Sequence, residues 1–391
     1  MTTPGALMQR MVKHIQTPLL PAIIAFAVAA MAAAIAAPPV ETNIDAIFAP
    51  LANTNSPGVA VLVRKHGKTI FARGFGVREL HTFAAIDAQT NFRLASCTKQ
   101  FAAMAIMLLA HDGKLRYDEK LTDIFADFPP YGQAITIRHL LNHTSGLPDY
   151  EDLMEAAEKR KGSLIWDETH QVHDEEVLAL LKHESAGKFP AGTKWSYSNS
   201  GYVVLGLIVK KLSGKSYPEF LHERIFAPLK MDSTVAYEKG KSEVARRAYG
   251  HSKEGDGWKQ TDQSSTSATL GDGGVYSSLT DLAKWDDALT RHTLLSEVEM
   301  NVALTPAKLA DGSQAVANSE NPDEPSSGYG FGWFLGAHRG HQRMWHSGDT
   351  MGFQTYILRF PAEKLSVIVL CNRIDLEPGN LAIKTADLFL Q

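Results

Sequence analysis

A serine and a lysine three positions apart, Ser96 and Lys99, are the residues whose types and spacing best fit nucleophilic chemistry. Residues three apart meet on one side of a helix, and residues 96–111 consist of helix-forming types up to the stop signal at Gly113. The start of a helix favours developing negative charge, and a desolvated lysine there can act as a base toward the serine. We therefore predict Ser96 as a nucleophile; the alternative is a plain helix cap.

The same Ser-x-x-Lys pattern occurs a second time, at Ser185 and Lys188. A pattern this short arises by chance, so the local structure must distinguish the two copies. The second copy contains Gly187 and is followed closely by Pro190, which indicates a loop. Only the first copy is therefore predicted to bring its serine and lysine together.

Tyr197 and Asn199 follow a turn rich in glycine and proline and lead into a predicted helix over 199–213. A phenol at this position could relay a proton to a leaving group, and an amide could hold a substrate carbonyl. The alternative is that Asn199 caps its helix and Tyr197 only packs.

A third polar segment, His346, Ser347 and Gly348, ends a predicted strand. Gly348 would let a substrate lie flat against the strand edge. A backbone N–H just after it could complete an oxyanion hole with the N–H of Ser96. The alternative is a strand that simply ends in a turn.

The elements that must position these residues are strands at both ends of the chain and helices between them. The predicted strands are 58–64, 69–77, 330–336, 343–346, 353–360 and 365–371, and the predicted helices are 41–52, 96–111, 136–143, 174–183, 199–213, 216–227, 279–290 and 381–390. We expect an α/β fold with one antiparallel sheet built from both termini and flanked by helices, plus a helical subdomain. The α/β part would span about 41–95 and 268–391, and the helical part about 96–267.

The order Ser-x-x-Lys, Tyr-x-Asn, His-x-Gly resembles the penicillin-recognising serine hydrolases, which comprise class C β-lactamases, D-Ala-D-Ala carboxypeptidases of the related type and their family VIII esterase relatives. The stretches 140–148, 189–205 and 271–283 are similar to that family as well, so the resemblance covers roughly 42–390. It implies the β-lactamase/transpeptidase-like fold.

The resemblance also implies a role for each matching residue. Ser96 would form the acyl-enzyme, Lys99 would be its base, and Tyr197 would share in proton transfer. Asn199 would position the substrate, while His346, Ser347 and Gly348 would form the third motif. The oxyanion hole would use the backbone N–H groups of Ser96 and Asp349.

The third motif differs from that of many β-lactamases, and the difference concerns substrate choice. Many β-lactamases carry Lys-Thr-Gly where this chain has His346-Ser347-Gly348. A histidine has an ordinary pKa of about 6.5 and is largely neutral at pH 7, so it holds a β-lactam carboxylate less well than a lysine. Arg343 is a candidate to restore the charge. The sequence favours a peptidase acting on D-amino-acid peptides, then a short-chain esterase, then a weak β-lactamase; a non-catalytic penicillin-binding sensor is the alternative of another class.

Composition and charge limit the kinds of molecule that the protein is expected to bind. The chain has 391 residues and a formal net charge of -4, without a basic block of the kind that nucleic-acid binding requires. The expected partner is a small-molecule or peptide substrate, and no metal or cofactor is expected.

Several polar residues and both cysteines are expected to have no role in catalysis. His170, His173 and Asp174 are expected on a solvated surface, and 150–161 as a solvated rim. Cys97 and Cys371 are expected to be two buried free thiols.

The first 36 residues read as a signal peptide. Arg10 and Lys13 precede an apolar run over 19–37 that ends in a small-x-small cleavage pattern at 34–36. Cleavage there would leave a hydrolase domain over 37–391, exported to the periplasm or secreted, with no stable membrane span. The alternative is an uncleaved N-terminal anchor.

Overall fold

The computed structural model describes residues 40–317 and 327–390. The proposed signal peptide lies outside these ranges and stays a prediction. The ranges belong to one compact unit that starts at Pro39. Within them, no helix is long and apolar enough to cross a membrane.

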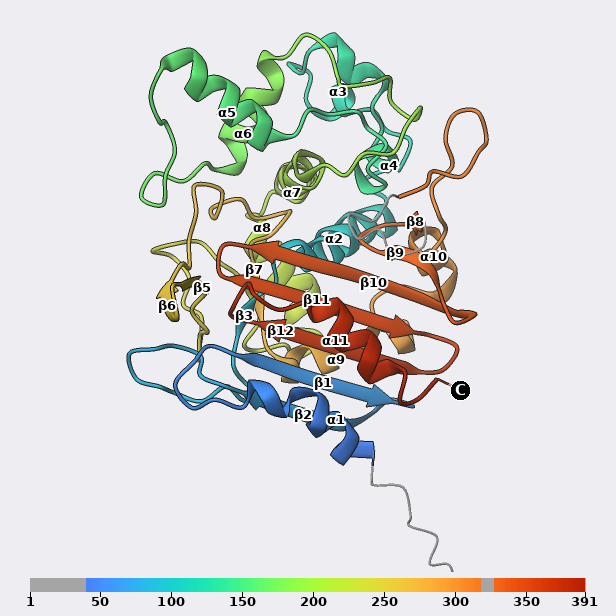
Figure 1. Ribbon diagram of the computed structural model, residues 1–391. Coiled ribbons are helices and arrows are strands. Elements are labelled where there is room, and N and C mark those ends of the chain that lie inside the picture. Colours follow the sequence, from blue (N-terminus) through green and yellow to red (C-terminus); the bar gives the residue numbers. More distant parts are fainter. Residues whose placement is uncertain (1–39, 318–326, 391) are drawn as a thin grey trace, which may run out of the picture. The chain divides into compact units, whose positions relative to one another are not determined.

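A seven-stranded antiparallel sheet joins the two ends of the described chain (Figure 1). Its strands, in spatial order, are β2 (Lys68–Phe75), β1 (Val59–Lys65), β12 (Leu365–Cys371), β11 (Phe353–Phe360), β10 (His341–Thr350), β9 (Phe334–His338) and β8 (Gly328–Tyr329). The pairing of β1 with β12 closes the sheet between segments some three hundred residues apart, with Val59 opposite Cys371. This confirms the expected sheet built from both termini.

Helices cover both faces of this sheet. On one face, α1 (Val40–Phe48) and α11 (Pro378–Ala386) pack on one set of alternating strand residues. On the other face lie α2 (Lys99–His111) and α9 (Leu279–Arg291), within a second and larger core. Because side chains alternate across a strand, neighbouring residues of β10 point into different cores: Trp345 belongs to the first and Met344 to the second.

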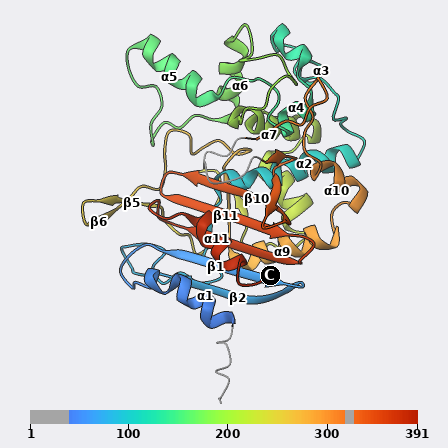
Figure 2. The same cartoon turned by 45° about the vertical axis from the view of Figure 1, so that its right-hand side comes forward.

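A mainly helical part lies beyond the β10 side of the sheet (Figures 1 and 2). Its helices are α3 (Leu121–Ile124), α4 (Ile137–Leu141), α5 (Tyr150–Lys161), α6 (Asp174–His183), α7 (Asn199–Ser213) and α8 (Tyr217–Leu221), the last continued by a π-helical turn over His222–Phe226. Short 3₁₀ turns occur at Ala49–Leu51, Ala95–Thr98 and Pro130–Ala134.

The range 96–267, expected to be the helical part, also contains strands. β4 (Val235–Ala236) joins β3 (Phe92–Arg93) and β7 (Val275–Ser277) in a small three-stranded sheet, and β5 (His251–Glu254) pairs with β6 (Gly257–Gln260). These strands are two to four residues long and polar at many positions, so they carry little hydrophobic periodicity. The helix α10 (Glu297–Ala303) was also not predicted.

The last strands of the main sheet agree with the sequence prediction, and the earlier ones differ. β11 and β12 have the expected bounds, whereas β10 is longer than 343–346 and β9 begins four residues later than 330. Gly332 explains the late start of β9. It has a φ of 76°, which turns the chain, and a Cβ there would lie 2.8 Å from the carbonyl oxygen of Lys99.

Candidate active site

Ser96 lies in a 3₁₀ turn, and Lys99 is the first residue of the helix α2 that follows. The prediction of an α-helix starting at Ser96 was therefore wrong in detail, but the turn still places the two side chains together. The Lys99 Nζ donates a hydrogen bond to the Ser96 Oγ over 3.0 Å. The turn starts from an uncommon backbone conformation, because Ala95 has a φ of 47°. Such conformations gather at functional sites.

Lys99 is completely buried, and three acceptors surround its ammonium group. Besides Ser96, these are the Asn199 Oδ1 at 2.9 Å and the backbone carbonyl of Asp272 at 3.1 Å. Burial lowers the pKa of Lys99 from 10.5 to about 8, although the carboxylates of Asp272 and Asp149 act in the opposite direction. A substantial fraction of this lysine is therefore neutral at mildly alkaline pH, which is the state that can accept the serine proton.

Asn199 is the first residue of α7, and its side chain faces Lys99. Ser198 caps this helix instead, because its side chain accepts the N–H of Gly201. The backbone N–H of Asn199 donates to the Asp149 Oδ2 over 2.9 Å, which fixes the start of the helix. Because the amide oxygen is used by Lys99, the amide NH₂ group is the part of Asn199 available to a substrate.

Tyr197 is half-buried beside the same lysine, with its ring centroid 4.8 Å from the Lys99 Nζ. Its hydroxyl has no hydrogen-bond partner among the residues the structure describes. Burial holds the pKa of this phenol well above its ordinary value of 10, while Ser96 acts to lower it. Tyr197 therefore stays protonated at neutral pH. It is suited to passing on a proton, and Lys99 is the better base.

The third predicted motif lies on β10, and its histidine is neutral. His346 is buried, with its Nδ1 2.6 Å from the Ser347 carbonyl and its Nε2 2.9 Å from the Tyr329 hydroxyl. Burial, with a smaller contribution from Lys99, lowers the pKa of His346 to about 3. The Nδ1 atom then carries the proton and Nε2 accepts from Tyr329. The site thus has no cation at the third motif near pH 7.

Arg343 does not restore this missing charge. It stacks on Trp345, with 4.0 Å from its guanidinium carbon to the ring. Residues 343 and 345 share one face of β10, and His346 lies on the other. Arg343, the candidate to restore the charge, therefore supplies no cation to the site.

Gly348 acts in a different way from the one expected. A Cβ at this position would lie 2.2 Å from the Leu94 carbonyl oxygen and 2.4 Å from the Thr355 Oγ1. The missing side chain therefore lets the turn that carries Ser96 pack directly on β10, rather than clearing room for a substrate. Cys97, in the same turn, also anchors on β10 through its thiol, which donates to the His346 carbonyl over 3.2 Å. Cys97 and Cys371 are both buried and free, as expected.

A small pocket opens over Ser96. Of the predicted site residues, it is lined by Ser96, Asn199 and Asp349. Lys99 and His346 are buried and Tyr197 is half-buried, whereas Ser347 is exposed and does not line it.

Acidic residues that were not predicted also line this pocket. Asp272 is 5% exposed and accepts a hydrogen bond from the Tyr150 hydroxyl on its Oδ2, while its Oδ1 has no partner in the described part of the chain. Glu151 keeps part of its side chain in solvent. Its pKa is nevertheless raised to about 7, first by burial and then by the carboxylates of Asp149 and Asp272. Arg93 also lines the pocket, but its guanidinium donates to the carbonyls of Gly273 and Ser267.

These acids lie in stretches that the sequence marked only as family-like or as solvent-facing. The segment 150–161 was expected to be a solvated rim, and most of it is exposed or half-buried. Tyr150 and Met154 are buried, and the exposed Glu151 lines the pocket. Asp174, expected on a solvated surface, is also buried and accepts the Leu270 N–H over 3.0 Å. A Gly-Asp-Gly-Gly turn at 271–274 was the signal available for Asp272.

Comparisons with known proteins agree with this fold. The sequence profile of the Beta-lactamase family matches residues 44–389. Penicillin-binding protein 4* of Bacillus subtilis is 31% identical over 362 residues, which cover 89% of this chain and 75% of that protein. The fold is thus the β-lactamase/transpeptidase-like fold. The chain belongs to the beta-lactamase family, within the penicillin-recognising serine hydrolases.

Solved structures give the same result. An octameric penicillin-binding protein homologue from Pyrococcus abyssi superposes with a TM-score of 0.73 at 27% identity, covering 90% of this chain and 76% of that one. A D-amino acid amidase from Ochrobactrum anthropi SV3 superposes with a TM-score of 0.73 at 24% identity, covering 89% and 98% of the two chains. At that identity, the second likeness supports the fold alone.

Proposed function

We propose that this chain is a serine hydrolase that cleaves an amide or ester bond through an acyl-enzyme on Ser96. The observation that carries the proposal is the hydrogen bond from a completely buried Lys99 to the Ser96 hydroxyl. A surface lysine would be a poor base at neutral pH, whereas burial brings the pKa of Lys99 to about 8. Nucleophile, base and proton relay then occupy one site.

In the acylation step, neutral Lys99 takes the Ser96 proton as the Oγ attacks the carbonyl carbon. The negative charge that develops on the carbonyl oxygen would be stabilised by the backbone N–H groups of Ser96 and Asp349. When the tetrahedral intermediate collapses, the bond to the leaving group breaks. Protonated Lys99, through the Tyr197 hydroxyl, returns the proton to the leaving nitrogen or oxygen. A water molecule then repeats the sequence on the acyl-enzyme and releases the acid.

The charges around the pocket favour substrates without a free carboxylate next to the scissile bond. His346 is neutral, and Glu151, Asp272 and Asp349 line the pocket. A carboxylate-bearing β-lactam or C-terminal peptide would meet these acids without a cation from the third motif. We therefore favour D-amino-acid amides or peptides with a free amine at the acyl side, and small neutral esters, over carboxypeptidase or β-lactamase substrates. The D-configuration follows from the resemblance of the three sequence motifs to D-Ala-D-Ala carboxypeptidases.

Steady-state kinetics with three substrates test this proposal. We expect turnover of p-nitrophenyl acetate and of D-alanine p-nitroanilide, little turnover of benzylpenicillin, and loss of all turnover in Ser96→Ala. A His346→Lys variant should improve the relative rate with benzylpenicillin, while Arg343→Lys, on the other face of β10, should not. Benzylpenicillin turnover above that of both other substrates would contradict the substrate assignment. Binding of all three without any turnover would support the non-catalytic sensor.

Export is part of the proposal and is supported by the sequence of residues 1–36. The N-terminal sequence of the protein recovered from a bacterial periplasmic fraction tests it. We expect a new N-terminus close to Ala37. Full-length protein in the membrane fraction would instead support an uncleaved anchor.

A further inference from the structure

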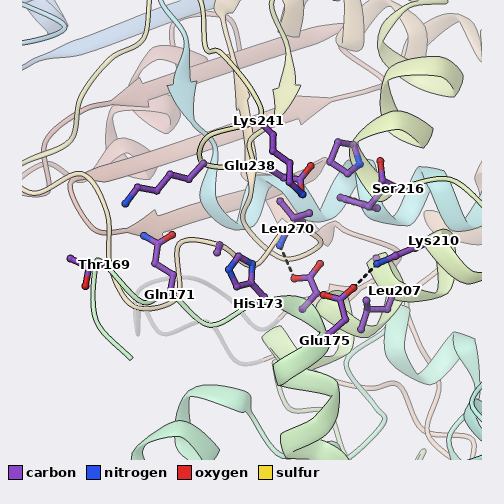
Figure 3. A pocket seen from close by; sticks show the side chains of 16 residues that line it. Thr169, Gln171, His173, Glu175, Leu207, Lys210, Ser216, Glu238, Lys241 and Leu270 are labelled. Carbon is purple, nitrogen blue, oxygen red and sulfur yellow. Dashed lines mark hydrogen bonds and ion pairs between the residues drawn. The ribbon is translucent and has the colours of Figure 1, made fainter. Parts of the chain in front are cut away.

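A second cavity, of about 340 Å³, is lined in part by the loop over 266–273, to which the labelled Leu270 belongs (Figure 3). The loop forms a wall between two spaces. Thr266, Thr269 and Asp272 line the pocket over Ser96, whereas Ala268 and Leu270 line the cavity. The volume falls in the range of small-molecule sites. No residue of the mechanism above lines it.

Two buried polar groups line this cavity. Tyr217 is 3% exposed, and its hydroxyl has no hydrogen-bond partner in the described ranges. Asp174 is 6% exposed, and its Oδ1 accepts the Leu270 N–H, the interaction drawn as a dashed line in Figure 3. Burial raises the pKa of Asp174 well above its usual range, although the Leu270 N–H and Lys210 act in the opposite direction. Leaving a buried hydroxyl without a partner is unfavourable. A bound protonated amine would give the Tyr217 hydroxyl a hydrogen bond and Asp174 an ion pair.

The charged residues around the cavity are paired except at two places. Lys210 pairs with Glu175 at 2.6 Å, and Lys241 pairs with Glu238 at 2.9 Å. Among the described residues, this leaves the buried Asp174 without an ion-pair partner and the exposed Lys239 without an anion. Leu207 and Leu270 add apolar surface between them. The remaining charges therefore suit a ligand with a cation at one end, an anion at the other and an apolar side chain.

We propose that this cavity binds a free α-amino acid with an apolar side chain as an effector. The ammonium group lies against Asp174 and Tyr217, and the carboxylate faces Lys239. The site is separate from the one that forms the acyl-enzyme, and its occupancy does not depend on the proposed activity.

The cavity is connected to the catalytic lysine by a short series of hydrogen bonds. Asp174 holds the Leu270 backbone, and two residues later the Asp272 carbonyl accepts from the Lys99 Nζ. The Tyr150 hydroxyl ties the Asp272 side chain to α5. An ammonium group at Asp174 changes the charge that holds Leu270, and so changes the position of the carbonyl that holds Lys99. The amino acid should therefore alter kcat rather than compete with substrate.

Isothermal titration of the Ser96→Ala protein with D-leucine and L-leucine tests binding without any turnover. We expect at least one enantiomer to bind with one-to-one stoichiometry, and its N-acetyl and amide derivatives to bind about tenfold more weakly because each lacks one charge. Lys239→Glu should weaken binding about tenfold and Tyr217→Phe about fivefold. Lys114→Glu makes the same charge change elsewhere on the surface and should leave binding unchanged.

The same leucine, added to wild-type protein hydrolysing p-nitrophenyl acetate, should change kcat with saturation, and this change should disappear in Lys239→Glu. Failure of both enantiomers to bind the Ser96→Ala protein would overturn the proposal. Binding that both substitutions leave intact would place leucine elsewhere and overturn it too. An effect on KM alone would show that leucine acts at the catalytic pocket.

Discussion

The two copies of the Ser-x-x-Lys pattern show why only one of them brings its serine and lysine together. At 96–99 a 3₁₀ turn passes into α2, and the lysine is completely buried against the serine. At 185–188 the chain is a loop, and Lys188 lies at the surface, paired with Asp152 at 2.7 Å. The residue types are the same. Helical geometry and burial distinguish the two copies. Helical geometry brings the serine and lysine side chains together, and burial makes the lysine a base.

The largest effect should come from removing either member of the buried pair. Ser96→Ala and Lys99→Ala should each lower kcat/KM for p-nitrophenyl acetate by at least about 10³-fold, because the nucleophile or its base is lost. Ser185→Ala and Lys188→Ala are the matched controls and should stay within about twofold of wild type. If substitutions at Ser185 or Lys188 lowered kcat/KM as much as those at Ser96 or Lys99, the distinction between the two copies would be contradicted.

Tyr197→Phe should have the next largest effect. Loss of a positioned proton relay costs on the order of 10²-fold in kcat, and stability should hardly change because the hydroxyl has no hydrogen-bond partner among the described residues. Tyr131→Phe gives the opposite pattern: it removes a bond to the Leu181 carbonyl, costs about 1 kcal/mol of stability and leaves kcat unchanged. Unchanged kcat in Tyr197→Phe would remove this residue from the mechanism.

Gly348→Ala tests how strand β10 holds the 3₁₀ turn that carries Ser96. The new Cβ would meet the Leu94 carbonyl, so we expect a loss of about 2 kcal/mol in the free energy of unfolding, together with lower activity as the turn shifts. Gly257→Ala, whose Cβ would meet only the Glu254 carbonyl at 3.6 Å, should cost less than about 0.5 kcal/mol. Urea unfolding of both variants provides the measurement. Equal stability of the two would show that the close approach at Gly348 is unimportant.

The pH dependence of activity should follow the buried lysine. Neutral Lys99 is the base and its pKa is about 8, so kcat/KM for a neutral ester should fall about tenfold per pH unit below that value. The folded pKa also lies below 10.5, so the unfolded state binds more protons between about pH 8 and 10.5, and Lys99 makes stability rise with pH in that window. Lys188→Ala should keep the same pH profile. Activity that is flat from pH 8 to 6 would contradict the role of Lys99.

The sequence was sufficient to predict the main sheet and the contact between Ser96 and Lys99. The strands at 353–360 and 365–371 are rich in β-branched, aromatic and other apolar residues and flank a turn, and Ser96 opens a strong helical pattern. These features are local, so they can be read from a single chain. The second Ser-x-x-Lys copy was rejected for the same local reason, its glycine and proline.

What could not be predicted depends on approach between distant segments. Gly348 is needed because Leu94 packs on it, and Asp174 is buried because the loop at Leu270 covers it. His346 read as an ordinary titratable histidine, and only its burial and its contact with Tyr329 set its neutral state. The local sequence around each of these residues does not indicate which distant residue it will contact.

The most direct test of the central claim is to locate the covalent bond. Wild type, Ser96→Ala and Ser185→Ala would each be incubated with benzylpenicillin and, separately, with p-nitrophenyl acetate, quenched in acid, and examined by intact mass and peptide mapping. We predict an acyl adduct on the peptide that contains Ser96 in wild type and in Ser185→Ala, and none in Ser96→Ala. An adduct on Ser96→Ala protein, or one that maps to Ser185, would contradict the account.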